Sequence, residues 1–392
     1  MFKSVLSLTL AAALGTASFG QTTLTAIPGE AAAAKYASIS QEILRAIEKG
    51  NEYLKSKQNP EGYWAQPSYP ALTALAVTAY MRDPANQGKP VPEYIRKGYD
   101  FILKSQKEDG SIFNRGMSSY NTAVCMMALL AANKEEYAPA ILKGRAYLIK
   151  QQNHFAPDNP YNGGIGYGDK QAPPIADLSN TSLALEAIYY SQKLAKDGKY
   201  GEQPDLDWNA ATEFINRCQQ NPAVNKEPWV SNDKSQLGGF VYRPGVSSAR
   251  DKKSAAFDKA EPPKAYGSMT YAGMQSLIYA NVDKNDPRVK LALKWLENSY
   301  SLDENPGMGV QGLYYYYQAM SKALSAMGID TLTLENGRKV DWRDELANKL
   351  ISIQKSVGSW VNTNNRWWEA DPVLVTSYCV LALEQLYHSI PR

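Results

Sequence analysis

Histidine is scarce in this chain of 392 residues, which contains only His154 and His388. Zinc sites in proteins draw most of their ligands from histidine and cysteine. Neither histidine stands with a cysteine where a shared metal site would be expected, and both are expected at the surface. A serine or cysteine nucleophile would therefore also lack a histidine base. We expect no metal site, no cofactor and no nucleophilic pair of this kind.

Cysteine is also rare, with three residues, so at least one must stay unpaired. Cys125 and Cys379 lie within apolar segments, where free cysteine behaves as a small buried hydrophobic residue. Cys218 has no obvious partner. We expect no disulfide framework.

The chain lacks both a strong net charge and a long apolar run. Its formal charge is +3, with acids and bases interspersed, which argues against nucleic acid as a partner. The apolar stretch 5–14 is too short to span a membrane. Together with Lys3 and the small residues around Gly20, it makes residues 1–20 resemble a secretory signal peptide. We expect a soluble protein exported to the periplasm or the extracellular space.

A repeated motif is the main positive feature of the sequence. Residues 49–64 read Lys-Gly-x-x-Tyr-Leu-x-x-x-Gln-x-x-x-Gly-x-Trp. Five variants follow, at 97–113, 143–166, 214–240, 295–309 and 350–360. The copy at 295–309 lacks the glutamine. A repeat that extends along the whole chain points to a repetitive architecture.

Each copy is followed by a second apolar segment whose hydrophobic residues recur at i, i+3, i+4 and i+7, which predicts a helix. These segments share one aligned position, occupied by Thr73, Thr122, Thr181, Thr270, Tyr317 and Thr376. No long alternating pattern indicates a sheet. Each unit is thus an outer helix, a glycine turn and an inner helix, and such hairpins must stack to bury their apolar faces.

The motif resembles the QW repeat of squalene and hopene cyclases, whose superfamily includes protein prenyltransferase β subunits and complement thioester domains. The resemblance covers roughly residues 40–390. It implies an all-α fold, an α/α toroid of six helical hairpins around a central cavity. We expect a single toroid domain over 39–392, a flexible lead-in over 21–38 and a rim insertion over 221–266.

The resemblance also implies chemistries that can be sought in the residues. The cyclases protonate an alkene with an Asp-x-Asp-Asp-Thr motif, and residues 177–181 here read Asp-Leu-Ser-Asn-Thr. Ser179 replaces the acid, and a hydroxyl is too weak an acid for this step, so Asp177 is the one catalytic candidate left. The prenyltransferase zinc ligands and the thioester Cys-Gly-Glu-Gln sequence are absent from the sequence.

Glycan cleavage is a further chemistry that toroids of this kind perform. A hydrolase needs two carboxylates, and a lyase needs a base together with a cation. Candidates near the starts of the inner helices are Asp169, Asp177, Glu369 and Asp371, with Arg115, Arg243 and Arg366 as cations. Several of these aspartates also suit the N-cap position of a helix.

Tyrosine dominates the aromatic residues, with 26 copies against 8 Phe and 8 Trp, and suits a cavity for a sugar or an isoprenoid. The ligand-binding candidates are Tyr120, Asn121, Arg243, Tyr266, Tyr271, Tyr314, Trp367, Trp368 and Asp371. The leading interpretation is an exported protein without the family's known catalytic chemistry that binds an isoprenoid-like, glycan or protein ligand in its aromatic cavity. The alternatives are a divergent terpenoid cyclase using Asp177, or a glycan-active lyase or hydrolase.

Overall fold

The computed structural model describes residues 28–168, 175–249 and 262–390, and side chains from Tyr36 onward. The signal-peptide segment 1–20 and Asp169 lie outside these ranges. Outer helices are α1 (Pro28–Ser56), α3 (Glu93–Lys104), α5 (Ala138–Lys150), α7 (Trp208–Cys218), α9 (Pro287–Asn298) and α11 (Trp342–Ser352). Inner helices are α2 (Pro70–Arg82), α4 (Ser118–Ala131), α6 (Leu178–Lys196), α8 (Gly267–Tyr279), α10 (Leu313–Met327) and α12 (Pro372–Ser389).

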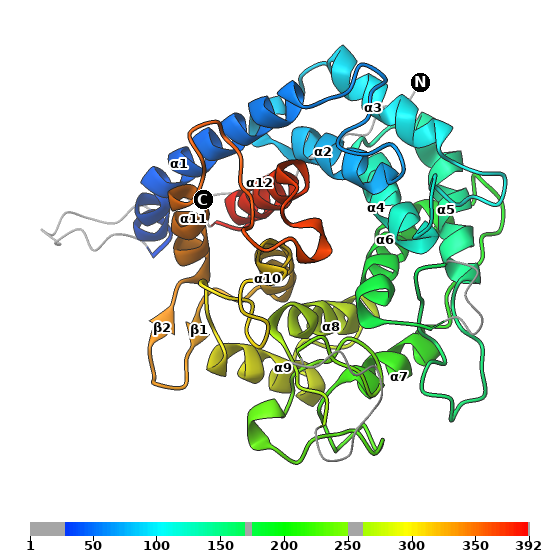
Figure 1. Ribbon diagram of the computed structural model, residues 1–392, viewed down its shortest axis with the longest axis vertical. Coiled ribbons are helices and arrows are strands. Elements are labelled where there is room, and N and C mark those ends of the chain that lie inside the picture. Colours follow the sequence, from blue (N-terminus) through cyan, green and yellow to red (C-terminus); the bar gives the residue numbers. More distant parts are fainter. Residues whose placement is uncertain (1–27, 169–174, 250–261, 391–392) are drawn as a thin grey trace, which may run out of the picture.

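The inner helices form a closed ring in which each packs against the two inner helices beside it (Figure 1). α12 packs against α2, so the last hairpin meets the first. The predicted all-α toroid of six helical hairpins is confirmed. The smaller elements are η1 (Pro84–Asn86), η2 (Glu135–Tyr137), η3 (Lys234–Gln236), η4 (Arg366–Trp368) and the antiparallel strands β1 (Leu332–Thr333) and β2 (Lys339–Val340).

The motif glutamine ties each turn to the next outer helix. The side-chain amide of Gln58 donates to the carbonyl of Gly62 in its own turn, at 3.0 Å, and to the carbonyl of Tyr94 in α3, at 2.7 Å. The same pair of bonds is made by Gln106, Gln152, Gln219 and Gln354. Gln354 donates to Ala46 of α1, so this bond closes the outer ring.

The motif glycine allows the turn to approach the neighbouring outer helix closely in five of the six hairpins. Gly358 has φ of +88°, and a Cβ placed on it would lie 2.3 Å from the carbonyl oxygen of Lys49. The aligned threonine then fixes the turn to the inner helix, because its hydroxyl accepts a hydrogen bond from the turn. Trp360 N donates to Thr376 Oγ1 at 3.1 Å, and Trp64 N donates to Thr73 Oγ1 at 3.0 Å.

Hairpin five, whose motif is incomplete, has different side chains and different hydrogen bonds at these positions. Tyr300 stands at the glutamine position, and its hydroxyl donates to Glu345 of α11 at 3.1 Å. Tyr317 stands at the threonine position, and its hydroxyl donates to the carbonyl of Leu302. The ring therefore continues through the copy with the weakest sequence signal.

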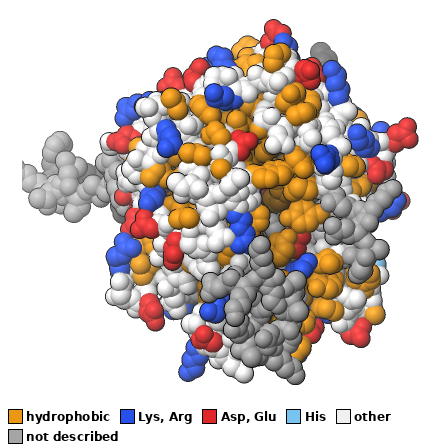
Figure 2. Space-filling model, viewed as in Figure 1, with side chains coloured by type: hydrophobic (Ala, Val, Ile, Leu, Met, Phe, Trp, Pro, Cys, Tyr) orange, Lys and Arg blue, Asp and Glu red, His pale blue; other side chains and the backbone are white. Residues whose placement is uncertain are grey.

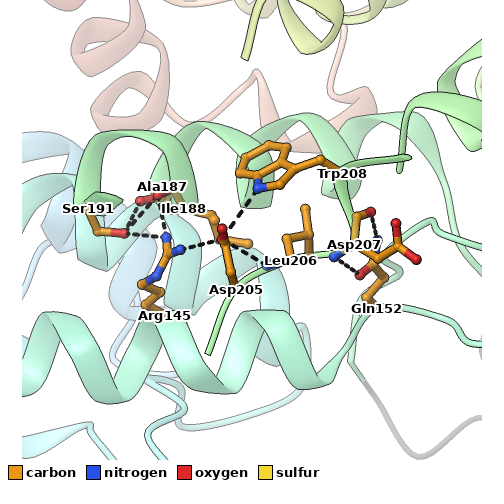
Figure 3. Close-up of polar contacts among 9 residues, drawn as sticks. All are labelled: Arg145, Gln152, Ala187, Ile188, Ser191, Asp205, Leu206, Asp207 and Trp208. Atoms are coloured by element: carbon orange, nitrogen blue, oxygen red, sulfur yellow. Dashed lines mark hydrogen bonds and ion pairs between the residues drawn. The ribbon is translucent and has the colours of Figure 1, made fainter. Parts of the chain in front are cut away.

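A buried arginine joins α5 to α6 beside one of these glutamine braces (Figure 3). Arg145 is 1% exposed and donates to the carbonyl of Ile188, to Ser191 Oγ at 3.3 Å and to Asp205 Oδ1 at 2.7 Å. Asp205 also accepts from the indole of Trp208. The pairing offsets the cost of burying the guanidinium charge.

One expected segment differs in extent from the sequence analysis. α1 begins at Pro28, so it includes most of the 21–38 segment expected to be flexible. The ring of Tyr36 is buried, and its hydroxyl donates to Asp341 at 2.6 Å, which ties α1 to the start of α11. Of the 221–266 insertion, residues 250–261 lie outside the described ranges. The rest runs from the end of α7 to α8 and includes η3.

Replacing Gly358 with alanine is expected to destabilise the ring by more than backbone strain alone. Gly337, in the β1–β2 turn, is the matched control, because it also has positive φ but has no atom within 4 Å of a Cβ. Gly337→Ala should lower the free energy of unfolding by about 1–2 kcal/mol. Gly358→Ala should cost about 1–3 kcal/mol more, because of the clash with Lys49. Urea unfolding measures both; equal losses would contradict a tight closure here.

Candidate functional site

The inner helices surround a cavity of about 460 Å³ that lies at the end of the ring where these helices begin. Figure 2 shows hydrophobic side chains gathered in a hollow near the centre of the molecule. Among the described residues, nine aromatic side chains line it: Tyr69, Tyr120, Tyr167, Tyr242, Tyr266, Tyr315, Tyr378, Trp367 and Trp368. The lining is therefore apolar over most of its area, with hydroxyl groups at several points.

Three tyrosines from different inner helices form the deepest part of this cavity. Tyr120 of α4 and Tyr378 of α12 both line this part of the wall, and each affects the pKa of the other's hydroxyl. The rings of Tyr315 and Tyr378 lie 6.1 Å apart. Burial raises the pKa of all three phenols, so they remain protonated hydrogen-bonding groups.

The rim carries two exposed tryptophans in an uncommon backbone conformation. Trp367 and Trp368 have φ of +55° and +65°, and they are 46% and 40% exposed. The Trp368 ring packs 4.6 Å from Tyr69, and the Arg366 guanidinium lies 4.4 Å from the Trp367 ring. Positive φ at bulky residues costs free energy, which the surrounding contacts must offset.

Glu369 holds this loop against α10. Its Oε1 accepts from Tyr315 N at 2.8 Å, and its Oε2 accepts from the Asn362 amide at 2.7 Å. It is 1% exposed, and burial raises its pKa, while the hydrogen bond from Tyr315 N opposes the rise. Glu369 is the one carboxylate among the described residues that line the cavity. Both of its oxygens are engaged in capping the helix and anchoring the loop.

Asp177, the candidate acid, is the N-cap of α6. Its two oxygens accept from the backbone N and the side-chain amide of Asn180, both at 2.8 Å. It is 2% exposed, and burial raises its pKa to about 6 in spite of these hydrogen bonds. Asp177 is not part of the cavity wall, whereas Ser179 and Asn180 are. The motif positions that reach the cavity therefore carry no carboxyl group.

The structure brings four of the nine predicted ligand-binding residues to the cavity: Tyr120, Tyr266, Trp367 and Trp368. The others lie elsewhere. Asn121 accepts from Ala71 N and so joins α4 to α2, and Asp371 caps α12. Tyr271 packs on Tyr316, and the hydroxyl of Tyr314 donates to the carbonyl of Val361. Arg243 lies near Asp177.

Five lining aromatics were not predicted: Tyr69, Tyr167, Tyr242, Tyr315 and Tyr378. The alignment of the repeats could have predicted one of them, Tyr315. The residue two positions before the aligned Thr or Tyr faces the cavity in five of the six hairpins, as Tyr120, Ser179, Ser268, Tyr315 and Leu374. Tyr167 and Tyr242 come from loops, for which no register exists.

Over residues 28–168, 175–249 and 262–390, no group of three or more His, Cys, Asp or Glu residues is placed to hold a metal ion. Cys125, Cys218 and Cys379 are buried and free. None of the helices in these same ranges is long and apolar enough to cross a membrane.

The site is thus an aromatic cavity inside an α/α toroid. No protein-family model matches the sequence. The apo structure of the type II terpene cyclase MstE from Scytonema superposes with a TM-score of 0.52 at 11% identity, over 89% of this chain and 99% of that one. An MstE variant with geranylgeranyl dihydroxybenzoate bound as substrate gives 0.52 at 10% identity, over 90% and 99%. This chain therefore has a terpenoid cyclase-like fold.

Stability is expected to depend on the protonation of Asp177. Its folded pKa of about 6 lies above the ordinary 3.8, so the folded state binds this proton more tightly. The contribution of protonated Asp177 to the free energy of unfolding is fully present below about pH 4. It falls as the pH rises towards and through 6, by up to about 3 kcal/mol. Asp177→Asn should remove this fall, because asparagine also caps helices but does not ionise.

Urea unfolding at pH 4 to 7 measures the effect. Asp207→Asn, at the exposed N-cap of α7, is the control for replacing a capping carboxylate. The same pH profile in the wild type and Asp177→Asn would show that Asp177 is not buried as described.

Proposed function

We propose that this protein binds a hydrophobic, isoprenoid-like small molecule in its central cavity, and that it does not perform the acid-initiated cyclisation of the enzymes it resembles in fold. The observation that supports binding is the 460 Å³ cavity with its nine aromatic side chains. Small-molecule sites occupy roughly 300–1,000 Å³ and are lined mainly by apolar and aromatic groups with a few polar ones. Export, expected from residues 1–20, would place this binding outside the cytoplasm.

The arrangement of carboxylates supports the absence of cyclase chemistry. Protonation of an alkene needs an acid that touches the ligand, and Ser179 occupies the place of that acid. Asp177 is turned to its own helix, and Glu369 has both oxygens bonded to α10 and to Asn362. Neither carboxylate is free to deliver a proton into the cavity as the described residues stand.

Glycan hydrolysis is less well supported for a similar reason. That reaction needs two carboxylates on either side of the scissile bond. Glu369 is the single carboxylate in the described cavity wall, and it is already engaged. A lyase would need a free base beside a cation, and Arg243 lies near the buried Asp177 rather than in this wall.

The structural neighbours agree with a prenylated ligand. An MstE variant was solved with geranylgeranyl dihydroxybenzoate as substrate and another with merosterolic acid A as product. These ligands belong to MstE. They indicate the size and polarity of molecule that a toroid cavity of this fold can hold.

Geranylgeraniol is expected to bind the purified protein and to quench its tryptophan fluorescence, because Trp367 and Trp368 line the cavity. Ser179→Phe should weaken binding at least tenfold, since the larger side chain fills the cavity. Ser352→Phe, exposed at the end of α11, is the control and should bind as the wild type does. Fluorescence titration measures the dissociation constants. Failure of geranylgeraniol to bind, or equal affinity in Ser179→Phe, would refute the proposal.

A further inference from the structure

A second, smaller cavity of about 80 Å³ continues the lumen beyond the tyrosines. We call it the inner chamber. Four side chains line both cavities: Tyr120, Leu183, Tyr315 and Tyr378. The two spaces therefore adjoin at one layer of side chains, which includes these three tyrosines. Five of the six inner helices contribute to the wall of the inner chamber, so it belongs to the central axis of the ring.

An ion pair spans the ring at the inner chamber. Lys322 Nζ of α10 lies 2.5 Å from Glu186 Oε2 of α6. Because α8 stands between α6 and α10 in the inner ring, this bond reaches across the interior and does not join neighbouring helices (Figure 1). The Lys322 and Glu186 side chains are 21% and 7% exposed, so the charges are largely removed from water.

The inner chamber carries an excess positive charge. Arg82 of α2 also lines it, and its guanidinium donates to the neutral amide of Gln385 at 2.8 Å. Within the described ranges, Arg82 has no carboxylate within ion-pair distance. Burial raises the pKa of the nearby Glu384 well above its ordinary value, which favours its neutral form. With Lys322 paired to Glu186, the lining of the chamber has a net charge of about +1.

The helical register sets the depth of this charge. Glu186 follows Ser179 by seven residues on α6, and Lys322 follows Tyr315 by seven residues on α10. Seven residues of an α-helix rise about 10 Å. The charged layer therefore lies two helical turns beyond the floor of the aromatic cavity. A molecule that occupies both spaces must be elongated, apolar along its length and anionic at its inner end.

We propose that the ligand of this protein is an isoprenoid carboxylate, bound with its carboxylate in the inner chamber against Lys322 and Arg82. Its chain passes the tyrosine layer and fills the aromatic cavity. A single negative charge matches the net charge of the lining, and the 80 Å³ chamber suits a small head group. A carboxylate also accepts two hydrogen bonds from a guanidinium. This inference rests on the proposed function.

The test compares two probes that share one chain, geranylgeranoic acid and geranylgeraniol, by calorimetric titration at pH 7.5. The wild type should bind the acid about tenfold more tightly than the alcohol. In Lys322→Met this ratio should fall to about one. In Glu186→Gln it should rise, because the competing carboxylate of the protein is gone. Lys193→Met, on the exposed outer side of α6, is the matched control and should keep the wild-type ratio.

Lys322→Met leaves Glu186 unpaired, so two further variants protect the test against a folding defect. Arg82→Gln removes the other cation and leaves the ion pair intact, so it should lower the ratio to about one. Lys322→Met/Glu186→Gln removes the pair but keeps the charge of Arg82, so its ratio should stay above that of Lys322→Met. A wild-type ratio of one, or a ratio that survives in Lys322→Met and in Arg82→Gln, overturns the inference while leaving the proposed function intact. Absence of binding of either probe overturns the proposed function itself.

Discussion

The glutamine brace is the interaction on which the rest of this structure depends. One side-chain amide satisfies two carbonyl groups, one in its own turn and one near the start of the next outer helix, as Gln58 does with Gly62 and Tyr94. A carbonyl oxygen has two lone pairs, so the helical carbonyl can accept this bond in addition to its bond within the helix, while the turn carbonyl gains a partner. Because the bond reaches the next hairpin, it also sets the angle between successive hairpins. Gln354 makes the same bond to Ala46, which is possible only if the ring has closed.

The cavity is a consequence of this closure. The braces hold the outer helices, the threonine bonds hold each turn to its inner helix, and the inner helices are left with one face directed to the axis. Side chains on that face meet across the lumen because six helices surround it. Tyr120, Tyr315 and Tyr378 form a layer there, and the Lys322–Glu186 pair forms another. Neither layer is a contact between adjacent helices alone, so each depends on the whole ring.

Periodicity along the chain made the fold predictable, whereas the site was predictable only in part. The motif with its glutamine repeats in five hairpins and the helical spacing in all six, so local signals reinforce one another. Site residues occur once each. Four consecutive tyrosines from 314 cover every side of one helical turn, and only Tyr315 lines the cavity. Asp371 and Asn121 carry suitable polar groups near the starts of inner helices, but helix capping and helix packing use them. Tyr242 comes from a long loop whose path no periodic pattern describes.

The sequence by itself determined the helical hairpins, the positive-φ turns at Gly62 and Gly358, and the order in which the hairpins stack, because each follows from local spacing and backbone sterics. Tertiary structure alone decided which side chains face the axis together. It turned Asp177 towards its own helix and brought Lys322 to Glu186 across 136 positions of the chain. The reason is physical: a residue's neighbours along the chain set its conformation, whereas its chemistry depends on burial and on partners that only the closed ring brings within reach.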